Sequence, residues 1–349
     1  MIISKALTNW YKIHKRSLPW RKTADPYKIW VSEIILQQTR VDQGTDYYHQ
    51  FIDKFPDIKS LANADQDEVL KLWQGLGYYN RARNMHHTAR YVLQNYDGEL
   101  PANYNELLSL KGIGPYTAAA IASFAFDEAV AVVDGNVKRV LSRVFGIKEP
   151  INTTKTEKTI QEIANQTLDT DSPGEHNQAL IEFGALQCVP KNPACSTCPL
   201  SEICEAYNQN MVHSLPVKSP PKKKKNRYFY YLVINHSQKY IFINKRTQKD
   251  VWNSLYEFPL IEREQRTDIE ALTQSKEWGT LLNETKPLIT NISKEYKHVL
   301  SHQNIFATFL EIQIKKPTDF LIQNYISIDR EELGEYAVSR LIERYLQSG

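Results

Sequence analysis

Cysteine is scarce in this 349-residue chain: there are only four, and all lie between Cys188 and Cys204. Long apolar runs are missing as well. The longest uncharged stretch, 112–126, is interrupted by glycine and proline and falls short of the roughly 18 apolar residues that span a membrane. The N-terminal residues lack the apolar core of a signal peptide. These absences predict a soluble intracellular protein, with the bacterial cytoplasm as its expected location.

The chain also lacks a large excess of charge of either sign, because its net charge is only +3. Residues 1–209 hold 22 lysines and arginines against 24 aspartates and glutamates, a balance of −2. Residues 210–349 hold 21 against 16, a balance of +5. A charge this even does not by itself indicate nucleic-acid binding, so contacts with phosphate groups must come from local placement of cations or backbone amides.

The chain changes character near residue 212. Before it, apolar residues recur at helical spacing in 66–73, 81–95, 116–126, 137–145 and 155–167. The stretch 212–226 combines three prolines with five lysines, which is typical of a solvated linker. Beyond it, strand-like stretches rich in β-branched and aromatic residues occupy 228–236, 239–245 and 305–314, and 331–347 returns to helical spacing. The sequence thus predicts a multidomain protein, with an all-helical domain over 1–211, a Pro/Lys-rich linker over 212–226 and an α+β domain over 227–349.

The cysteines follow the spacing C-x6-C-x2-C-x5-C, at Cys188, Cys195, Cys198 and Cys204. A disulfide framework is typical of secreted chains, and nothing in the sequence indicates secretion. Four thiolates from one compact segment suit either a zinc ion or an iron–sulfur cluster. Ligand chemistry alone leaves both possibilities open.

A glycine-containing turn occurs in LKGIGPYTAAAIASF, residues 110–124. Gly112 and Gly114 permit positive φ and close approach to the backbone, and Pro115 suits the first turn of a helix. The amides at that helix start can hold a phosphate group, although an ordinary helical hairpin fits the same residues. Further on, an apolar run ends at Asp134, which can simply cap the helix that follows.

A second acidic residue, Glu33, lies among apolar neighbours in WVSEIIL, residues 30–36. Burial disfavours an ionised carboxylate and raises its pKa, which is the condition for a general acid near neutral pH. Periodicity alone permits another interpretation. In it, Glu33 lies on the polar stripe of an amphipathic helix, with Gln37 four positions later.

The cysteine spacing after a helical domain resembles the [4Fe–4S] loop of the endonuclease III superfamily of DNA glycosylases. The turn at Gly112 and Gly114 resembles the helix–hairpin–helix motif of that superfamily, and Asp134 stands where its members carry an essential aspartate. The resemblance implies a [4Fe–4S] cluster over 188–204 that fastens a loop without taking part in hydrolysis. It also implies that the hairpin glycines approach the DNA backbone.

The motifs LPWR (18–21) and SEIILQQT (32–39) are similar to those of the adenine DNA glycosylases, and this likeness spans residues 8–206. It implies that Glu33 is the catalytic acid, that Asp134 stabilises the sugar, and that Tyr116 and Asn136 orient them. Gln38 and Tyr78 match residues that enter the duplex. The full set implied to contact DNA or adenine in this part of the chain is Trp20, Arg21, Leu36, Gln37, Gln38, Thr39, Gly77, Tyr78, Gly112, Gly114 and Gln178.

The residue at position 116 bears on the type of reaction. Lyase-type members of the superfamily carry a lysine at this place and form a Schiff base with the sugar. This chain has Tyr116, and Lys111 does not match that position. Excision of the base by water, without strong strand cleavage, is therefore expected.

Residues 228–349 resemble the Nudix-like C-terminal domain of the adenine DNA glycosylases. VWNSLYEFP at 251–259 fits a strand-and-turn feature in which the family usually has Gly-Leu-Trp before Glu-Phe-Pro. The segment after Pro259 lacks the Arg-Glu-x-x-Glu-Glu metal box, so we expect recognition and no pyrophosphate hydrolysis. KHVLSHQNI at 297–305 resembles a loop that recognises 8-oxoguanine through Phe-Ser-His. Ser301 and His302 are kept, Leu300 replaces the aromatic residue, and a plain surface Ser-His pair also fits.

The resemblance predicts a monofunctional adenine DNA glycosylase of base excision repair. It would flip adenine mispaired with 8-oxoguanine or guanine out of double-stranded DNA and hydrolyse its N-glycosidic bond, as a monomer at the nucleoid. Three alternatives stay open on the sequence. They are a non-catalytic damage-binding protein, an endonuclease III-like glycosylase of another base specificity, and a zinc-stabilised Nudix hydrolase.

Overall fold

The computed structural model describes residues 2–220, 223–237, 239–283 and 285–348. Its contacts divide the chain into two compact units. One comprises Met1–Ala64 and Arg83–Pro220, and the other comprises Asp65–Ala82 and Pro221–Gly349. Domain boundaries at residues 211 and 227 remain a prediction from the sequence, and positions 221 and 222 of the expected linker lie outside the described residues.

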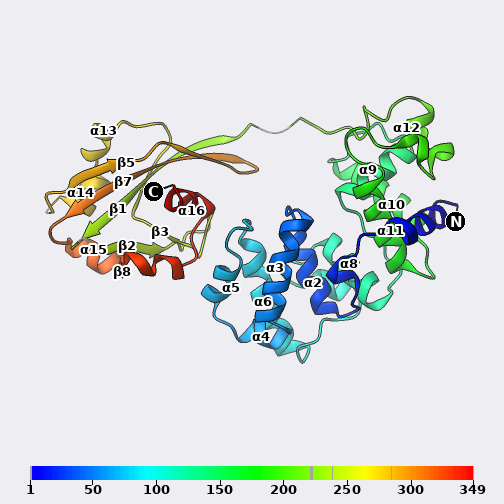
Figure 1. Ribbon diagram of the computed structural model, residues 1–349, viewed down its shortest axis with the longest axis horizontal. Coiled ribbons are helices and arrows are strands. Elements are labelled where there is room, and N and C mark those ends of the chain that lie inside the picture. The colour runs from blue at the N-terminus through cyan, green and yellow to red at the C-terminus, as the bar shows by residue number, and fades with distance from the viewer. Residues whose placement is uncertain (1, 221–222, 238, 284, 349) are drawn as a thin grey trace. The chain divides into compact units, whose positions relative to one another are not determined.

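The first unit is built from helices, and those expected over 81–95, 116–126, 137–145 and 155–167 are confirmed (Figure 1). In chain order its elements are α1 (Ile2–His14), η1 (Pro19–Arg21), α2 (Pro26–Leu36), α3 (Val41–Lys54), α4 (Ile58–Asn63), α6 (Asn80–Asn95), α7 (Tyr104–Ser109), α8 (Pro115–Phe126), α9 (Gly135–Val144), α10 (Thr154–Thr167), α11 (Pro173–Leu186), η2 (Cys195–Thr197), η3 (Ser201–Ile203) and α12 (Glu205–Asn208). The first three residues of α6 belong to the segment of the second unit.

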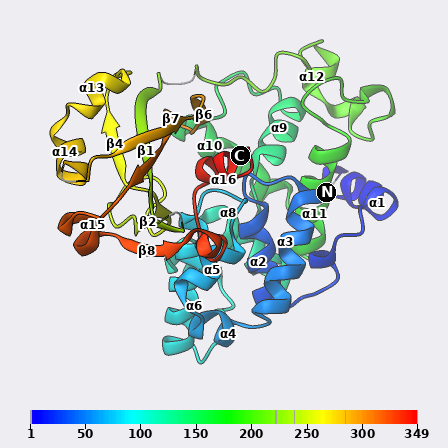
Figure 2. The ribbon, with the colours of Figure 1, turned by 60° about the vertical axis from the view of Figure 1, so that its left-hand side comes forward.

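Four helices of the first unit surround a cavity that Glu33 and Asp134 line. α2 packs against α8, and α11 packs against α8 and α9, in agreement with their arrangement in both views (Figures 1 and 2). Val137, Val140 and Leu141 of α9 follow helical spacing and are buried in one apolar core with residues of α1, α10 and α11. This packing fixes the start of α9, where Asp134 lies.

The second unit contains α5 (Gln66–Leu72) and one sheet that follows residue 222. The strands run in the order β3-β2-β1-β7-β5, with β4 on β1, β6 on β7 and β8 on β2. β1 and β7 are parallel from Lys225↔Gln303 to His236↔Ile314. The bounds are β1 (Lys225–His236), β2 (Tyr240–Lys245), β3 (Tyr256–Glu257), β4 (Leu260–Arg263), β5 (Leu288–Ile292), β6 (Tyr296–Val299), β7 (Gln303–Ile314) and β8 (Ile326–Asp329).

Alternation along β1 gives this sheet two apolar faces. Phe229 and Tyr231 face α16 (Arg340–Leu346). Tyr230 faces the opposite layer of α13 (Ile269–Thr273), α14 (Lys276–Leu282) and α15 (Asp319–Asn324) (Figure 2). The expected C-terminal helix is divided into η4 (Arg330–Glu335) and α16, because Val338 between them bridges to Tyr256 in the sheet. The α+β expectation for this part of the chain is confirmed.

Helices of the described residues are all too short or too polar to cross a bilayer.

Ser254 has the largest φ among the non-glycine residues with positive φ that the structure describes in the second unit. Ser254 has a φ of +66°, in the left-handed region, where a residue with a Cβ costs about 1 kcal/mol or more relative to glycine. We expect Ser254→Gly to raise the free energy of unfolding by about 1 kcal/mol and the Tm by a few degrees. Ser327→Gly, in the exposed part of β8, is the control and should destabilise. A Tm for Ser254→Gly at or below wild type would contradict this account.

Candidate active site

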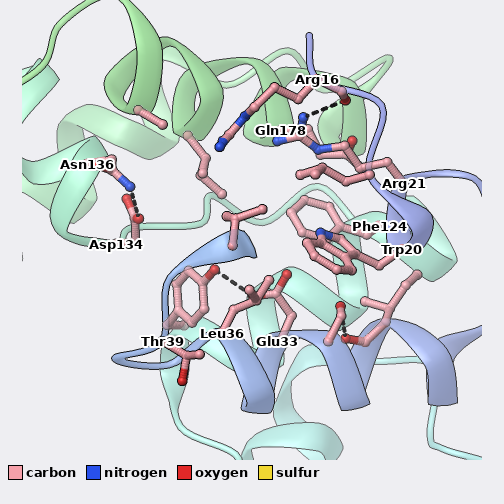
Figure 3. A pocket seen from close by; sticks show the side chains of 17 residues that line it. Arg16, Trp20, Arg21, Glu33, Leu36, Thr39, Phe124, Asp134, Asn136 and Gln178 are labelled. Carbon is pink, nitrogen blue, oxygen red and sulfur yellow. Dashed lines mark hydrogen bonds between the residues drawn. The ribbon is translucent and has the colours of Figure 1, made fainter. Parts of the chain in front are cut away.

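Glu33 projects from α2 into a cavity of about 260 Å³ within the first unit (Figure 3). The start of α2 is well defined, because Asp25 accepts hydrogen bonds from the amides of Tyr27 and Lys28, and Pro26 occupies the first turn. Eight of the helix's eleven side chains are buried, and Glu33 itself is only 7 % exposed. The polar-stripe interpretation of Glu33 is therefore wrong.

The surroundings of Glu33 favour its protonated form. Burial raises the pKa of Glu33 to about 7, although a hydrogen bond from the Tyr116 hydroxyl to its Oε2, at 2.5 Å, lowers it. The charge of Asp134 raises the pKa further, and Arg21 opposes that effect. A carboxyl group with a pKa near 7 can hold a proton at neutral pH and still give it to a weak base.

Tyr116→Phe should move the alkaline limb of the pH–rate profile to higher pH. The hydroxyl stabilises the carboxylate, so its loss raises the pKa of Glu33 above about 7. On the expectation that the acid form of Glu33 donates the proton, the single-turnover reaction should persist at pH values where the wild type has already declined. The readout is the midpoint of the limb, which does not depend on the maximal rate. An unmoved midpoint, or one at lower pH, would count against the role of this hydrogen bond.

Asp134 lines the same cavity from the start of α9. One carboxylate oxygen accepts from the Val137 amide at 2.7 Å, and the other accepts from the Asn136 side-chain amide at 2.8 Å. Asp134 therefore caps α9, as the sequence permits, and its carboxylate also lines the cavity. Burial raises the pKa of Asp134, and these hydrogen bonds counteract the rise by favouring the ionised form. Glu33 and Asp134 therefore share one cavity in different environments.

Gly112 and Gly114 form the turn before α8, and the structure distinguishes them. Gly112 has a φ of +83°, and a Cβ there would lie 2.5 Å from the Cβ of Asn84, so only glycine fits. Gly114 differs from expectation, since its φ is −90° and a Cβ would meet open space. Positive φ is required at Gly112 alone, while the exposed Gly114 leaves the start of α8 accessible.

The end of the cavity opposite Asp134 is lined by both polar and aromatic side chains. Arg21, Phe124 and Gln178 lie across the cavity from Asp134 and Asn136 (Figure 3). Trp20 is buried beside them and packs edge-on against Tyr48, with ring centroids 5.4 Å apart. Leu36 and Thr39 complete the wall on the α2 side. This end combines stacking surfaces with hydrogen-bonding groups, as a pocket for a heteroaromatic base requires.

Sequence reasoning missed the ion pair that holds this end in place. The carboxylate of Glu182, which is fully buried, accepts hydrogen bonds from Arg16 at 2.6 Å and Arg21 at 2.8 Å. Burial alone would raise the pKa of Glu182, but these arginines outweigh it and lower the pKa to about 2. Arg16 and Glu182 are 166 residues apart, so no local pattern could have paired them.

The four cysteine side chains line a single cavity beside α9 and α11. The guanidinium of Arg143 donates to Cys188 Sγ at 3.4 Å and to the carbonyls of Val189 and Pro190 at 2.8 and 3.1 Å. Arg143 is 2 % exposed, so it orders the first part of this loop from within. Four thiols around one cavity form the donor set that an iron–sulfur cluster uses.

Arg139 joins the cysteine loop to Asp134. Its Nε donates to the Cys188 carbonyl at 2.8 Å, and its Nη2 donates to Asn136 Oδ1 at 2.9 Å. Asn136 in turn donates to Asp134. The position of the loop and the orientation of the carboxylate are therefore linked by consecutive hydrogen bonds. The only sequence signal for Arg139 was its place one helical turn after Asn136.

The residues that follow α2 differ in their surroundings. Gln37 donates to the Thr117 hydroxyl at 3.2 Å, and Thr39 lines the cavity. Gln38 is exposed and has a φ of +61°. An exposed polar side chain on a left-handed backbone residue suits contact with a ligand outside the cavity.

Four of the predicted site residues lie in the second unit. Gly77 and Tyr78 form a turn with φ of +69° and +48°, and Tyr78 is 54 % exposed. Ser301 and His302 form the exposed tip of the β6–β7 hairpin, with Ser301 Oγ 3.1 Å from His302 Nδ1. Leu300 stands where the family has an aromatic residue, but its side chain packs against the apolar core on the α16 side of the sheet. It therefore does not act as a wedge.

Three family models match the chain. The model described as HhH-GPD superfamily base excision DNA repair protein covers residues 31–166, and the model of a NUDIX domain covers residues 230–348. The iron–sulfur binding domain of endonuclease III covers residues 188–204, from the first cysteine to the last. Together with the four thiols around one cavity, this match identifies the loop as the site of a [4Fe–4S] cluster, and the zinc alternative falls.

Relatives and solved structures agree with these matches. The adenine DNA glycosylase of Buchnera aphidicola subsp. Baizongia pistaciae is 38% identical over 329 residues, which are 93% of this chain and 90% of that protein. The human adenine DNA glycosylase is 43% identical over 210 residues, 58% of this chain and 38% of that protein. A thermostable thymine-DNA glycosylase aligns with a TM-score of 0.56 at 31% identity, over 60% of this chain and 96% of its own. An endonuclease III–DNA complex has the same fold, with a TM-score of 0.52 at 20% identity over 60% of this chain and 95% of its own.

Proposed function

The chain belongs to the adenine DNA glycosylases of base excision repair, and we propose that Glu33 and Asp134 together hydrolyse the N-glycosidic bond of adenine. One observation carries the proposal. Two carboxyl groups face a single cavity, one held near a pKa of about 7 by burial and the other hydrogen-bonded as an anion. Such a pair supplies an acid for the leaving group and a negative charge for the sugar.

The proposed reaction begins with a flipped adenine. A stacked base cannot be reached, so the nucleotide rotates out of the duplex at a cost of a few kcal/mol. Glu33 gives its proton to N7, and the electron pair of the C1′–N9 bond moves onto the adenine, which leaves as a neutral molecule. Asp134 stabilises the oxocarbenium-like sugar, as an anion or by brief covalent trapping. Water then adds to C1′, and its proton returns to Glu33.

The remaining roles follow the geometry of the cavity. Trp20, Arg21, Leu36 and Gln178 hold the base, and Tyr116 and Asn136 orient the two carboxyl groups. The described lining residues include no lysine, so a Schiff base has no amine partner there. We therefore propose hydrolysis without strand cleavage.

We propose that DNA is held by parts of both units. The exposed amides at the start of α8, next to Gly114, would bind a phosphate group. Gln37, Gln38 and Thr39 would contact the strand beside the cavity, and Tyr78 with Gly77 would enter the stack. Cys188, Cys195, Cys198 and Cys204 would hold the cluster and so fasten the loop at four points. Arg139 connects that loop to Asn136 by hydrogen bonds, and Asn136 donates to Asp134.

The base opposite adenine is the finer part of the proposal. We propose that it is 8-oxoguanine or guanine, and that Ser301 and His302 bind the 8-oxoguanine. The hairpin tip is held by the first residue of β1 and by the residue before that strand. The Lys225 amide donates to the His302 carbonyl at 3.2 Å, and Lys224 Nζ donates to the Leu300 carbonyl at 2.6 Å. A fixed, exposed tip with two polar side chains can read a base edge by hydrogen bonds.

Ser301→Ala should reduce the preference for 8-oxoguanine over guanine about fivefold, the value of one hydrogen bond of about 1 kcal/mol. Excision from A:G duplexes should stay unchanged, because the guanine edge lacks the group that the hydroxyl would recognise. Ser237→Ala is a matched control, since Ser237 forms a similar exposed pair with His236 Nδ1 at 2.7 Å in another turn of this unit. The measurement is the ratio of kcat/KM for the A:8-oxoG duplex to kcat/KM for the A:G duplex. A ratio that falls equally in both variants would exclude a specific role for Ser301.

A duplex assay tests the proposed function as a whole. The protein is incubated with A:8-oxoG, A:G and A:T duplexes, and each sample is divided and heated with or without alkali. We expect scission at adenine in the two mispairs, and only after alkali. Scission without alkali would contradict the monofunctional reaction, and excision of another base would contradict the specificity. We also propose that the protein acts as a monomer at the nucleoid, and co-elution with one duplex at a 1:1 ratio checks the stoichiometry.

A further inference from the structure

A second cavity of about 400 Å³ lies in the first unit, against the base end of the active-site cavity. We call it the rear cavity. Arg16, Leu18, Arg21, Phe124 and Gln178 line both cavities. Figure 3 shows Arg16, Arg21, Phe124 and Gln178 at the end of the active-site cavity that faces away from Asp134. These shared side chains are therefore a wall one residue thick between the two spaces.

The reaction needs a second opening to the active-site cavity. In the proposed reaction the flipped nucleotide enters past Asp134, and its own sugar and strand fill that entrance until the reaction is complete. Glu33 can activate a water molecule only where the carboxylate points, which is where N7 of the adenine was. The adenine must therefore leave before the water takes its place, and the entrance is still closed by the DNA.

We infer that the rear cavity receives the excised adenine and releases it while the DNA is still bound. This rests on the proposed placement of adenine between Glu33 and Gln178. Glu33 gives a proton to N7, the C1′–N9 electron pair stays with the purine, and water supplies hydroxide to C1′ and a proton to the Glu33 carboxylate. The departing purine is neutral, so it needs a passage that does not trap charge.

The composition of the rear cavity suits a neutral purine. Lys15, Lys22, Asp127 and Glu175 are among its lining residues, so both donors and acceptors are present for the ring nitrogens and the amino group. Arg16 and Arg21 also line the cavity and pair with the buried carboxylate of Glu182, so four cations stand against three carboxylates. This near balance gives little net attraction for an ion of either sign. A volume in the range of small-molecule pockets can accommodate one base.

Gln178 is held by fewer hydrogen bonds than the two arginines of the wall. Arg21 is fixed by Glu182 at 2.8 Å and by the Arg16 carbonyl at 3.3 Å. Gln178 accepts one hydrogen bond, from the hydroxyl of Tyr11 at 2.7 Å, and Tyr11 belongs to the rear cavity. Exchange of that bond for one to the purine would swing the side chain aside at little cost.

Filling the rear cavity tests the inference. Ser17 is exposed and lines only this cavity, so Ser17→Trp should obstruct it, with Ser17→Ala as the control. A duplex with radiolabelled adenine opposite 8-oxoguanine is used under single-turnover conditions. Bond cleavage is measured after an acid quench, and free adenine is measured after rapid passage through a filter that retains the protein–DNA complex.

We expect cleavage and release to coincide in the wild type and in Ser17→Ala. In Ser17→Trp, cleaved adenine should remain with the complex and be released at least tenfold more slowly. Lys22→Trp, with Lys22→Ala as its control, obstructs the same cavity and decides the outcome if Ser17→Trp does not fold. Coincident cleavage and release in a folded tryptophan variant would overturn the inference. Loss of cleavage in the wild type would instead sink the proposed function, because the two readouts are separate.

Discussion

Glu33→Gln is expected to lower the rate of adenine excision by about 10³-fold while duplex binding survives. The amide keeps the size of the side chain and can still accept the hydrogen bond from Tyr116, but it has no proton of suitable acidity to give. Glu33 lies in a buried position with a pKa near 7, so no water or buffer acid can readily replace it. Adenine would then have to leave as an anion.

The variant is measured by single-turnover excision and by equilibrium binding to an A:8-oxoG duplex. Glu162→Gln, an exposed change of the same kind on α10, is the control and should match the wild type in both. In the wild type the rate should fall as the pH rises through about 7, because the acid form of Glu33 is lost. An alkaline limb of this kind in Glu33→Gln, or an excision rate near wild type, would show that another group supplies the proton.

Asp134→Asn is expected to lower the excision rate by about 10²- to 10³-fold, the size of effect seen when one electrostatic stabiliser of a transition state is removed. Asparagine is a good helix cap, so the start of α9 should survive the change. The negative charge proposed to stabilise the developing sugar cation is lost, however. Among the described residues that line the cavity, Glu33 is the other residue with a carboxyl group. The variant therefore separates the capping role of Asp134 from its charge.

Thermal unfolding and excision are measured together for Asp134→Asn. We expect a Tm within a few degrees of the wild type beside the large loss of rate. A fall in rate accompanied by a large fall in Tm would show that the residue acts mainly as a cap. A rate near wild type in a folded variant would remove Asp134 from the reaction.

Local sequence patterns were sufficient for the features that depend on near neighbours. The position of Asp134 at the end of an apolar run predicted a cap on α9, and the structure has it. Around Glu33 the apolar neighbours indicated burial, but helical spacing also permitted a polar stripe, and that second interpretation was wrong. That the two carboxyl groups share a cavity followed only from the family resemblance.

Features that depend on distant partners could not be read from the sequence. The Arg16–Glu182 pair spans 166 residues, and the association of residues 65–82 with the second unit depends on the tertiary arrangement. The break before α16 comes from the bridge between Val338 and Tyr256, which is a non-local pairing. Gly114 shows that a local pattern can also mislead. The Gly-x-Gly pattern suggested that its φ could be positive, but the backbone at Gly114 is extended.

The central claim is that Glu33 gives its proton to N7 of adenine, and a substrate that lacks this nitrogen tests it most directly. Excision of 7-deazaadenine and adenine opposite 8-oxoguanine is compared in the wild type and in Glu33→Gln. If the proton goes to N7, removing the acid and removing its acceptor abolish the same interaction, so the two losses should not multiply. The account predicts that Glu33→Gln and the wild type are equally slow on 7-deazaadenine. A further loss of about 10³-fold in the variant on that substrate would contradict it.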